Sequence, residues 1–173
     1  MWTEHREQVF AEMLGEFRGN AADFLEIGSC EGASAIWLLE HILTNPDSTL
    51  ASIDIQAIER MQILMANLEE SGHAGRARIH RLDSKDLRKH FDDETFDFVY
   101  VDGAHDAPTT LRDVMAAFLI CKPGGLIGCD DYRLPNLEKG SHPGDAIDAF
   151  LAIYHQHVDV VHNGYQLWFR RID

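Results

Sequence analysis

The sequence predicts an α/β fold with a mostly parallel sheet, and two observations support this class. Short apolar runs that predict buried strands alternate with longer runs of helical periodicity over most of the chain. This alternation is typical of a parallel sheet with helices on both faces. The chain ends differently, with two strand-like runs separated only by Asn163 and Gly164, a pair typical of tight hairpins. Because a two-residue turn joins only antiparallel strands, the last strand is expected to run against the others.

The elements are expected in a regular order along the chain. The apolar residues of segment 2–17 recur at helical spacing, and Gly19 and Asn20 follow as a stop signal, so the chain opens with an amphipathic helix. Five strands are then expected at DFLEIG, TLASIDI, ARIHRL, FDFVYVD and, after a turn formed by KPGG, LIGCD. The intervening and following helices are expected at ASAIWLLEHIL, AIERMQILMANLEES, SKDLRKHF, TTLRDVMAAFLI and DAIDAFLAIYHQ. With the terminal strands VDVVH and YQLWFRR, the sheet has seven strands.

The composition indicates one domain, residues 1–173, in which residues 1–20 form an N-terminal cover helix. A chain of 173 residues, 45% of them apolar, can bury one core of ordinary size. The net charge, 15 − 29 = −14, repels phosphate backbones and anionic lipids. The N-terminus lacks the apolar run of a signal peptide, no segment resembles a membrane span, and three cysteines without paired spacing favour reduced thiols. We therefore expect a cytoplasmic protein with no nucleic-acid or membrane partner.

A glycine-containing turn follows the first strand, at Glu26–Ser34. It is neither a dinucleotide-binding Gly-x-Gly-x-x-Gly motif, because position 30 is Cys, nor a phosphate-binding loop, because no Gly-Lys-Ser/Thr follows. Asp54 ends the second strand 22 residues after Gly32, a spacing at which an acid can bind the hydroxyls of an adenosine ribose. Taken singly, the glycines are also explained as turn residues and Asp54 as a helix cap. Together with the hairpin, they indicate a site for adenosine without phosphate.

The pattern Glu-x-Gly-x-x-x-Gly-x-Ser resembles the motif of catechol-type O-methyltransferases and of the related macrocin-type sugar O-methyltransferases. The terminal hairpin is similar to the end of the sheet in class I S-adenosylmethionine (SAM) dependent methyltransferases, and the resemblance extends from Phe24 to Arg170. It implies a single-domain Rossmann-like fold with strand order 3-2-1-4-5-7-6. It also implies a SAM site formed by Glu26, Gly28, Ser29, Gly32, Ser34, Asp54, Ile55, Asp83, Ser84 and Asp102.

Within that implied site, each residue has a role. Gly28, Ser29, Gly32 and Ser34 would shape the methionine end, and Glu26 would hold their loop. By the same resemblance, Asp54 would bind the ribose, Ile55 would pack on the adenine, and Asp83 and Ser84 would lie beside its amino group. Without the resemblance, Asp83 would be interpreted as a helix N-cap.

Three aspartates are expected to converge at one edge of the sheet. Asp102 ends the fourth strand, and Asp130 and Asp131 end the fifth, so neighbouring fourth and fifth strands would bring them together. Carboxylates brought this close together repel one another unless a cation lies between them. Three carboxylates suit Mg2+, with Mn2+ and Ca2+ as alternatives. Otherwise, Asp130 and Asp131 would be solvated or would cap a turn.

The resemblance adds two expectations about this acidic site. Asp131 stands where catechol-type enzymes carry asparagine, and the sugar-modifying branch is more similar in having an acidic pair here. His105 stands where catechol-type enzymes carry a lysine base. A histidine, with an unperturbed pKa of about 6.5, can accept a proton at neutral pH, which makes His105 the candidate base.

The predicted function is SAM-dependent, metal-assisted O-methylation of a small-molecule hydroxyl on a sugar, a phenol or another natural-product-like acceptor. Three alternatives remain: an NAD(P)-dependent oxidoreductase, a non-catalytic SAM-binding protein, and a metal-independent methyltransferase that uses His105 and Asp131. The first is supported by Asp54 but opposed by Cys30 and the hairpin. The opening helix, with Trp2 and Phe10 as candidate exposed residues, is a potential homodimer surface, although packing on its own sheet is the simpler expectation.

Overall fold

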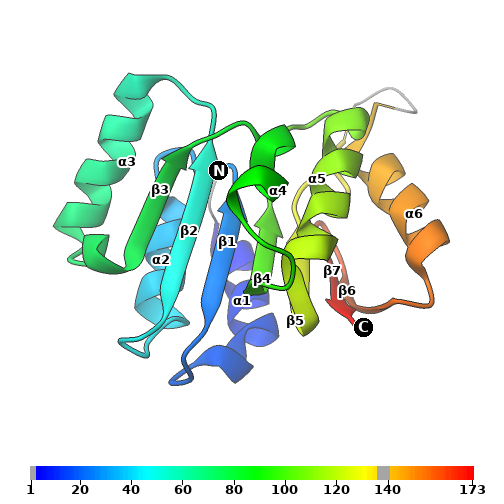
Figure 1. Ribbon diagram of the computed structural model, residues 1–173, viewed down its shortest axis with the longest axis horizontal. Helices are drawn as coiled ribbons and strands as arrows, with labels where there is room; N and C mark the ends of the chain where they lie inside the picture. Colours follow the sequence, from blue (N-terminus) through cyan, green and yellow to red (C-terminus); the bar gives the residue numbers. More distant parts are fainter. Residues whose placement is uncertain (1–2, 136–140) are drawn as a thin grey trace.

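The computed structural model describes residues 3–135 and 141–173, and one sheet runs through the whole of it (Figure 1). The strand order is β3-β2-β1-β4-β5-β7-β6, so the predicted order is confirmed. The strands are β1 (Asp23–Ile27), β2 (Thr49–Asp54), β3 (Ala77–Arg81), β4 (Phe96–Val101), β5 (Cys121–Cys129), β6 (Val158–Asn163) and β7 (Leu167–Arg171). Strands β1 to β5 pair in parallel, whereas β7 is antiparallel to both β5 and β6.

The helices follow the predicted alternation. They are α1 (Glu4–Met13), α2 (Ala33–His41), α3 (Ile58–Glu70), α4 (Leu87–His90), α5 (Ala107–Ile120) and α6 (Pro143–Tyr154). Short 3-10 turns lie at η1 (Gly15–Phe17), η2 (Ala74–Arg76) and η3 (Ser84–Asp86). The expected opening helix over 2–17 is therefore shorter, because α1 ends at Met13 before the turn η1. Among the described residues, no helix has the length and apolar character needed to cross a membrane.

Two expected chain reversals differ in detail from the structure. Asn163 still pairs with Leu167, so the hairpin turn consists of Gly164, Tyr165 and Gln166 rather than of Asn163 and Gly164. A shift in the β6–β7 register between Val160 and His162 accompanies this longer turn. The fifth strand also begins earlier than LIGCD, because the KPGG segment forms a bulge within β5.

Each face of the sheet carries its own apolar core. Alternate residues of the strands point to opposite faces, so Phe98 packs with α1, α2 and α3, whereas its neighbour Val99 packs with α4, α5 and α6. Figure 1 shows α4 and α5 in front of the sheet and α1 and α2 behind it.

The opening helix packs on its own sheet. Phe10 is fully buried, with its ring edge-on to Trp168 at 5.0 Å and to Tyr100 at 4.9 Å between centroids. The expectation that Phe10 is exposed at a dimer surface is therefore wrong, because the face of β4, β5 and β7 needs an apolar cover. Trp2, the other candidate, lies outside the described residues.

Candidate functional site

A cavity of about 860 Å³ lies at the carboxyl ends of the central strands, where the strand order reverses between β1 and β4. This is the position at which open α/β sheets bind ligands. Of the predicted site residues, those that line the cavity are Gly28, Asp54, Ile55, Asp83, Ser84, Asp102, His105, Asp130 and Asp131. The predicted residues that lie outside its lining are Glu26, Ser29, Gly32 and Ser34.

The two glycines of the turn after β1 are required by close packing. Gly28 has a φ of +94°, and a Cβ there would lie 2.0 Å from the carbonyl oxygen of Asp102. Gly32 has a φ of +89°, and a Cβ there would lie 2.3 Å from Cδ1 of Leu64. Gly28 therefore lets the turn lie against the end of β4, while Gly32 lets α2 start beneath α3.

Two polar atoms at and beside the turn lack a hydrogen-bond partner within the described part of the chain. The Ser29 hydroxyl and the Gln56 side-chain oxygen are buried and have no hydrogen-bond partner among the described residues. Such atoms are costly unless water or a ligand binds them. Gln56 lines the cavity, so its side-chain oxygen can bind a polar ligand there, whereas Ser29 lies outside the lining.

Glu26 holds the turn from below the cavity. It is fully buried, and its two carboxylate oxygens accept hydrogen bonds from the hydroxyls of Ser34 and, at 2.7 Å, Ser52. Burial raises the pKa of Glu26 to about 7, although the two serine hydrogen bonds oppose the shift. The Ser34 hydroxyl thus donates to Glu26, a carboxylate of the protein itself. This bond ties the start of α2 to β1, which is the loop-holding role predicted for Glu26.

Replacing Glu26 with glutamine is expected to flatten the pH dependence of stability between about pH 4.5 and 7. The folded state binds the proton more tightly than the unfolded state, so wild-type stability falls as pH rises through this window. The glutamine removes that fall, which is at most about 3 kcal/mol. Urea unfolding at pH 5 and pH 8 measures it, with the exposed Glu40→Gln as control. If stability changed with pH by the same amount in Glu26→Gln and Glu40→Gln, the raised pKa of Glu26 would be contradicted.

Asp54 links the turn to the end of β2. Its Oδ2 accepts hydrogen bonds from the backbone N–H groups of Ser29 at 3.0 Å and Cys30 at 3.1 Å, and its Oδ1 accepts one from Gln56 at 2.9 Å. It is not the N-cap of α3, since that position is Ala57 and has no side-chain cap. Ile55 follows at the rim and is 64% exposed, so its apolar surface is free to pack on a planar ligand.

Polar side chains line the cavity beside η3 and α5, among them Asp83, Ser84, Arg112 and Asp113. Of these four, only the first two were predicted from the sequence. Asp83 caps η3 by accepting from the Lys85 backbone N–H, and the lysine ammonium lowers the pKa of this carboxyl. Arg112 donates to Ser84 at 2.8 Å and to Asp113 at 3.2 Å. Burial raises the pKa of Asp113. Arg112 and Asp113 were missed because an Arg-Asp pair within a helix is usually a solvated surface feature.

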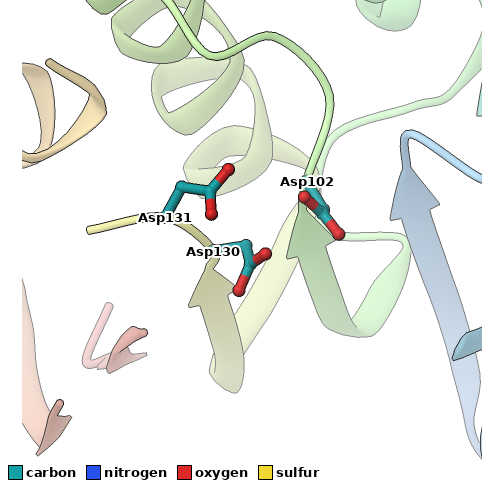
Figure 2. Close-up of side chains that lie close together, drawn as sticks. All are labelled: Asp102, Asp130 and Asp131. Atoms are coloured by element: carbon teal, nitrogen blue, oxygen red, sulfur yellow. The ribbon is translucent and has the colours of Figure 1, made fainter. Parts of the chain in front are cut away.

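The three aspartates converge as predicted. Val101 and Cys129 are paired at the ends of β4 and β5, so the next residues, Asp102 and Asp130, emerge side by side (Figure 2). One oxygen from each of Asp102, Asp130 and Asp131 lies within 4.8 Å of the others. Asp130 is 4% and Asp131 5% exposed, which excludes the solvated alternative. Burial and the Asp130 charge raise the pKa of Asp102 well above its usual range.

A cation from α1 lies against this cluster. The Arg6 guanidinium contacts Oδ2 of Asp130 and lies 3.8 Å from Oδ1 of Asp131. The hairpin turn contributes two neutral donors: Gln166 donates to Asp130 at 2.9 Å and Tyr165 donates to Asp131 at 2.5 Å. No motif or spacing in the sequence indicates any of these three donors.

His105 forms a pair with Asp131. Its Nδ1 lies 2.6 Å from Oδ2 of Asp131, and its side chain is 61% exposed. When Asp131 is ionised, it accepts a hydrogen bond from Nδ1–H, which leaves Nε2 as the ring atom that can accept a proton. Asp131 itself has a φ of +56°, a left-handed conformation that Asp and Asn adopt more readily than other residues with side chains.

Residues 25–132, more than half of the chain, match the family described as "Methyltransferase domain". No curated protein matches the chain in sequence. The family match argues against the nicotinamide oxidoreductase alternative.

Solved structures share the fold at low identity. TomG, an O-methyltransferase from Streptomyces achromogenes involved in tomaymycin synthesis and solved in complex with SAM, has a TM-score of 0.79 at 18% identity, over 100% of this chain and 82% of TomG. An O-methyltransferase from Bacillus cereus in complex with S-adenosylhomocysteine (SAH) has a TM-score of 0.73 at 19% identity, over 100% and 83%. The SAH-bound methyltransferase PaMTH1 from Podospora anserina has a TM-score of 0.77 at 16% identity, over 100% and 80%. The chain therefore belongs to the methyltransferase-domain family and has the class I fold of SAM-dependent O-methyltransferases.

Proposed function

We propose that the protein transfers the methyl group of SAM to a hydroxyl of a small molecule. One observation carries this proposal: a single cavity joins the turn at Gly28 and Asp54 on one side with the His105–Asp131 pair on the other. The first group suits the adenosine and methionine parts of SAM, and the second is a base held in one orientation. The SAM and SAH complexes of the structural neighbours support the same cofactor.

The residues have distinct tasks in this reaction. The acceptor oxygen attacks the methyl carbon in line, so a C–O bond forms as the C–S bond breaks, giving a methyl ether and SAH. His105 takes the hydroxyl proton at Nε2, and Asp131 stabilises the resulting imidazolium. The rest of the cavity aligns the reactants, which contributes roughly 7 to 11 kcal/mol in well-oriented systems.

We also propose a divalent cation, with Mg2+ preferred, at Asp102, Asp130 and Asp131. Three carboxylates within reach of one another, those of Asp130 and Asp131 buried and that of Asp102 half-buried, are the hard oxygen donors that this ion prefers. When bound, the ion makes an acceptor hydroxyl more acidic, which matters more for a sugar hydroxyl than for a phenol. A metal-independent reaction is the second candidate, and the contact of Arg6 with Asp130 favours it because a cation already lies at the cluster.

The acceptor is proposed to be a small hydroxylated molecule rather than a nucleic acid. The net charge of −14 opposes binding of a phosphate backbone. The exposed side chain of His105 lies where an acceptor can reach it from solvent.

Calorimetric titration with SAH, in Mg2+ buffer and again with chelator, tests the cofactor. We expect micromolar binding, and about tenfold or more weakening in Asp54→Ala, which loosens the turn and removes the ribose-binding acid. The exposed Asp47→Ala is the control. No binding in either buffer would overturn the proposed function. SAH production with panels of phenols and sugars would then identify the acceptor.

A further inference from the structure

We propose that Arg6 is the resident counter-ion of the acidic cluster, and that a divalent cation binds there only by displacing the Arg6 side chain. Arg6 thereby sets the affinity of the site for metal. The inference rests on the proposed function in one respect, the assignment of a divalent ion to Asp102, Asp130 and Asp131.

The first argument is the position of the guanidinium. It contacts Asp130 directly, lies 3.8 Å from Asp131, and only 14% of the Arg6 side chain is exposed. It also lies 5.8 Å from the centre of the Tyr165 ring, a distance at which a cation is attracted to the aromatic face. Arg6 is therefore held by contacts on more than one side and is not a loose surface arginine.

The second argument is that the oxygens of the paired aspartates are already in use. Oδ1 of Asp130 accepts from Gln166, and Oδ2 contacts Arg6. In Asp131, Oδ1 accepts from Tyr165 and Oδ2 lies against His105. Gln166 is buried and is itself fixed by Tyr100 and Trp168. Because Gln166 is fixed at Oδ1, a metal ligated by Asp130 has its freer approach at Oδ2, the oxygen that Arg6 contacts.

The third argument is electrostatic. A dication bound to that oxygen would lie a few ångströms from the guanidinium, and two cations repel strongly in a buried site. The three carboxylates outnumber the one arginine, and a dication favours the ionised form of Asp102, so the cluster attracts a dication even while Arg6 is bound. Replacement of the Arg6 guanidinium by the dication avoids the repulsion between the two cations and still neutralises the carboxylates.

The fourth argument is that Arg6 can leave while its helix stays. Thr3 caps α1, and Phe10 anchors the helix in the core. Rotation of the long Arg6 side chain therefore frees the cluster without unfolding α1, and the cluster retains a counter-ion in both states.

Metal titration of the full chain tests this exchange. Isothermal titration with Mn2+, in the presence of SAH, is expected to show binding at least about tenfold tighter in Arg6→Met than in wild type, because the repulsion is removed. Arg6→Lys keeps the charge and should remain close to wild type. Arg88→Met, which removes an exposed arginine paired with Asp93, is the matched control and should bind like wild type.

Thermal unfolding gives a second measurement. Without metal, Arg6→Met should melt below wild type, because the carboxylates lose their counter-ion, and Mg2+ should restore its Tm whereas NaCl of equal ionic strength should not. Equal Mn2+ affinity in wild type and Arg6→Met, or no binding in either, would overturn the exchange. SAH titration of the same samples separates the two proposals: retained SAH binding leaves the proposed function standing when the exchange fails.

Discussion

Replacing His105 with alanine is expected to lower kcat by about 10² to 10⁴-fold while SAH affinity stays unchanged. Nδ1 of this histidine is held by Asp131 at 2.6 Å, so Nε2 is presented as the proton acceptor. Without it, the acceptor hydroxyl loses its base but the cofactor side of the cavity keeps its contacts. SAH formation with the acceptor found by screening measures kcat, and calorimetry measures the affinity for SAH.

The control is His155→Ala, since His155 is exposed directly after α6 and, within the described part of the chain, its ring bonds to the backbone carbonyl of Ala152. A companion variant, Asp131→Asn, keeps the side-chain shape and suits the left-handed backbone at this position. It no longer fixes the tautomer of His105, so a large loss of kcat is expected here too. Near-normal turnover in His105→Ala would show that the histidine is not the base.

The topology could be predicted because it is encoded locally. The apolar periodicity of each segment fixes its element type, and a short hairpin fixes the direction of the last strand. The convergence of Asp102 with Asp130 also follows from sequence, because both residues end strands that are neighbours in the sheet. The two aspartates lie side by side because of the register between β4 and β5, which the apolar pattern of the strands determines.

The donors around the cluster could not be predicted, because their contacts join distant segments. Arg6 and Asp130 are 124 residues apart, and an arginine in an opening helix ordinarily faces solvent. Tyr165 and Gln166 were assigned to the last strand, whereas the longer turn places them beside the aspartates. The sequence did indicate that a cation was needed there, but not that the chain supplies one.

Replacing Asp130 with alanine is expected to lower the free energy of unfolding by about 3 to 5 kcal/mol, the largest stability effect that we predict. The Asp130 side chain is 1% exposed, and its loss leaves the mostly buried Arg6 guanidinium with the more distant Asp131 and leaves the Gln166 amide with Tyr100. Loss of the direct partner of a buried charge costs more than the pair contributed, since the remaining partner stays desolvated. Denaturant unfolding in metal-free buffer measures the change.

Asp102→Asn is the informative counterpart of Asp130→Ala, because it is expected to raise the free energy of unfolding rather than lower it. Asp102 is a carboxylate whose ionised form is opposed by burial and by the neighbouring Asp130 and Asp131 charges. A neutral amide of the same shape removes that repulsion, so in metal-free buffer at neutral pH the variant should unfold at a higher denaturant concentration than wild type. Destabilisation by both variants would mean that each aspartate has its own fixed partner. Opposite signs would show that Arg6 neutralises Asp130 and leaves the charge of Asp102 uncompensated until a divalent ion replaces Arg6.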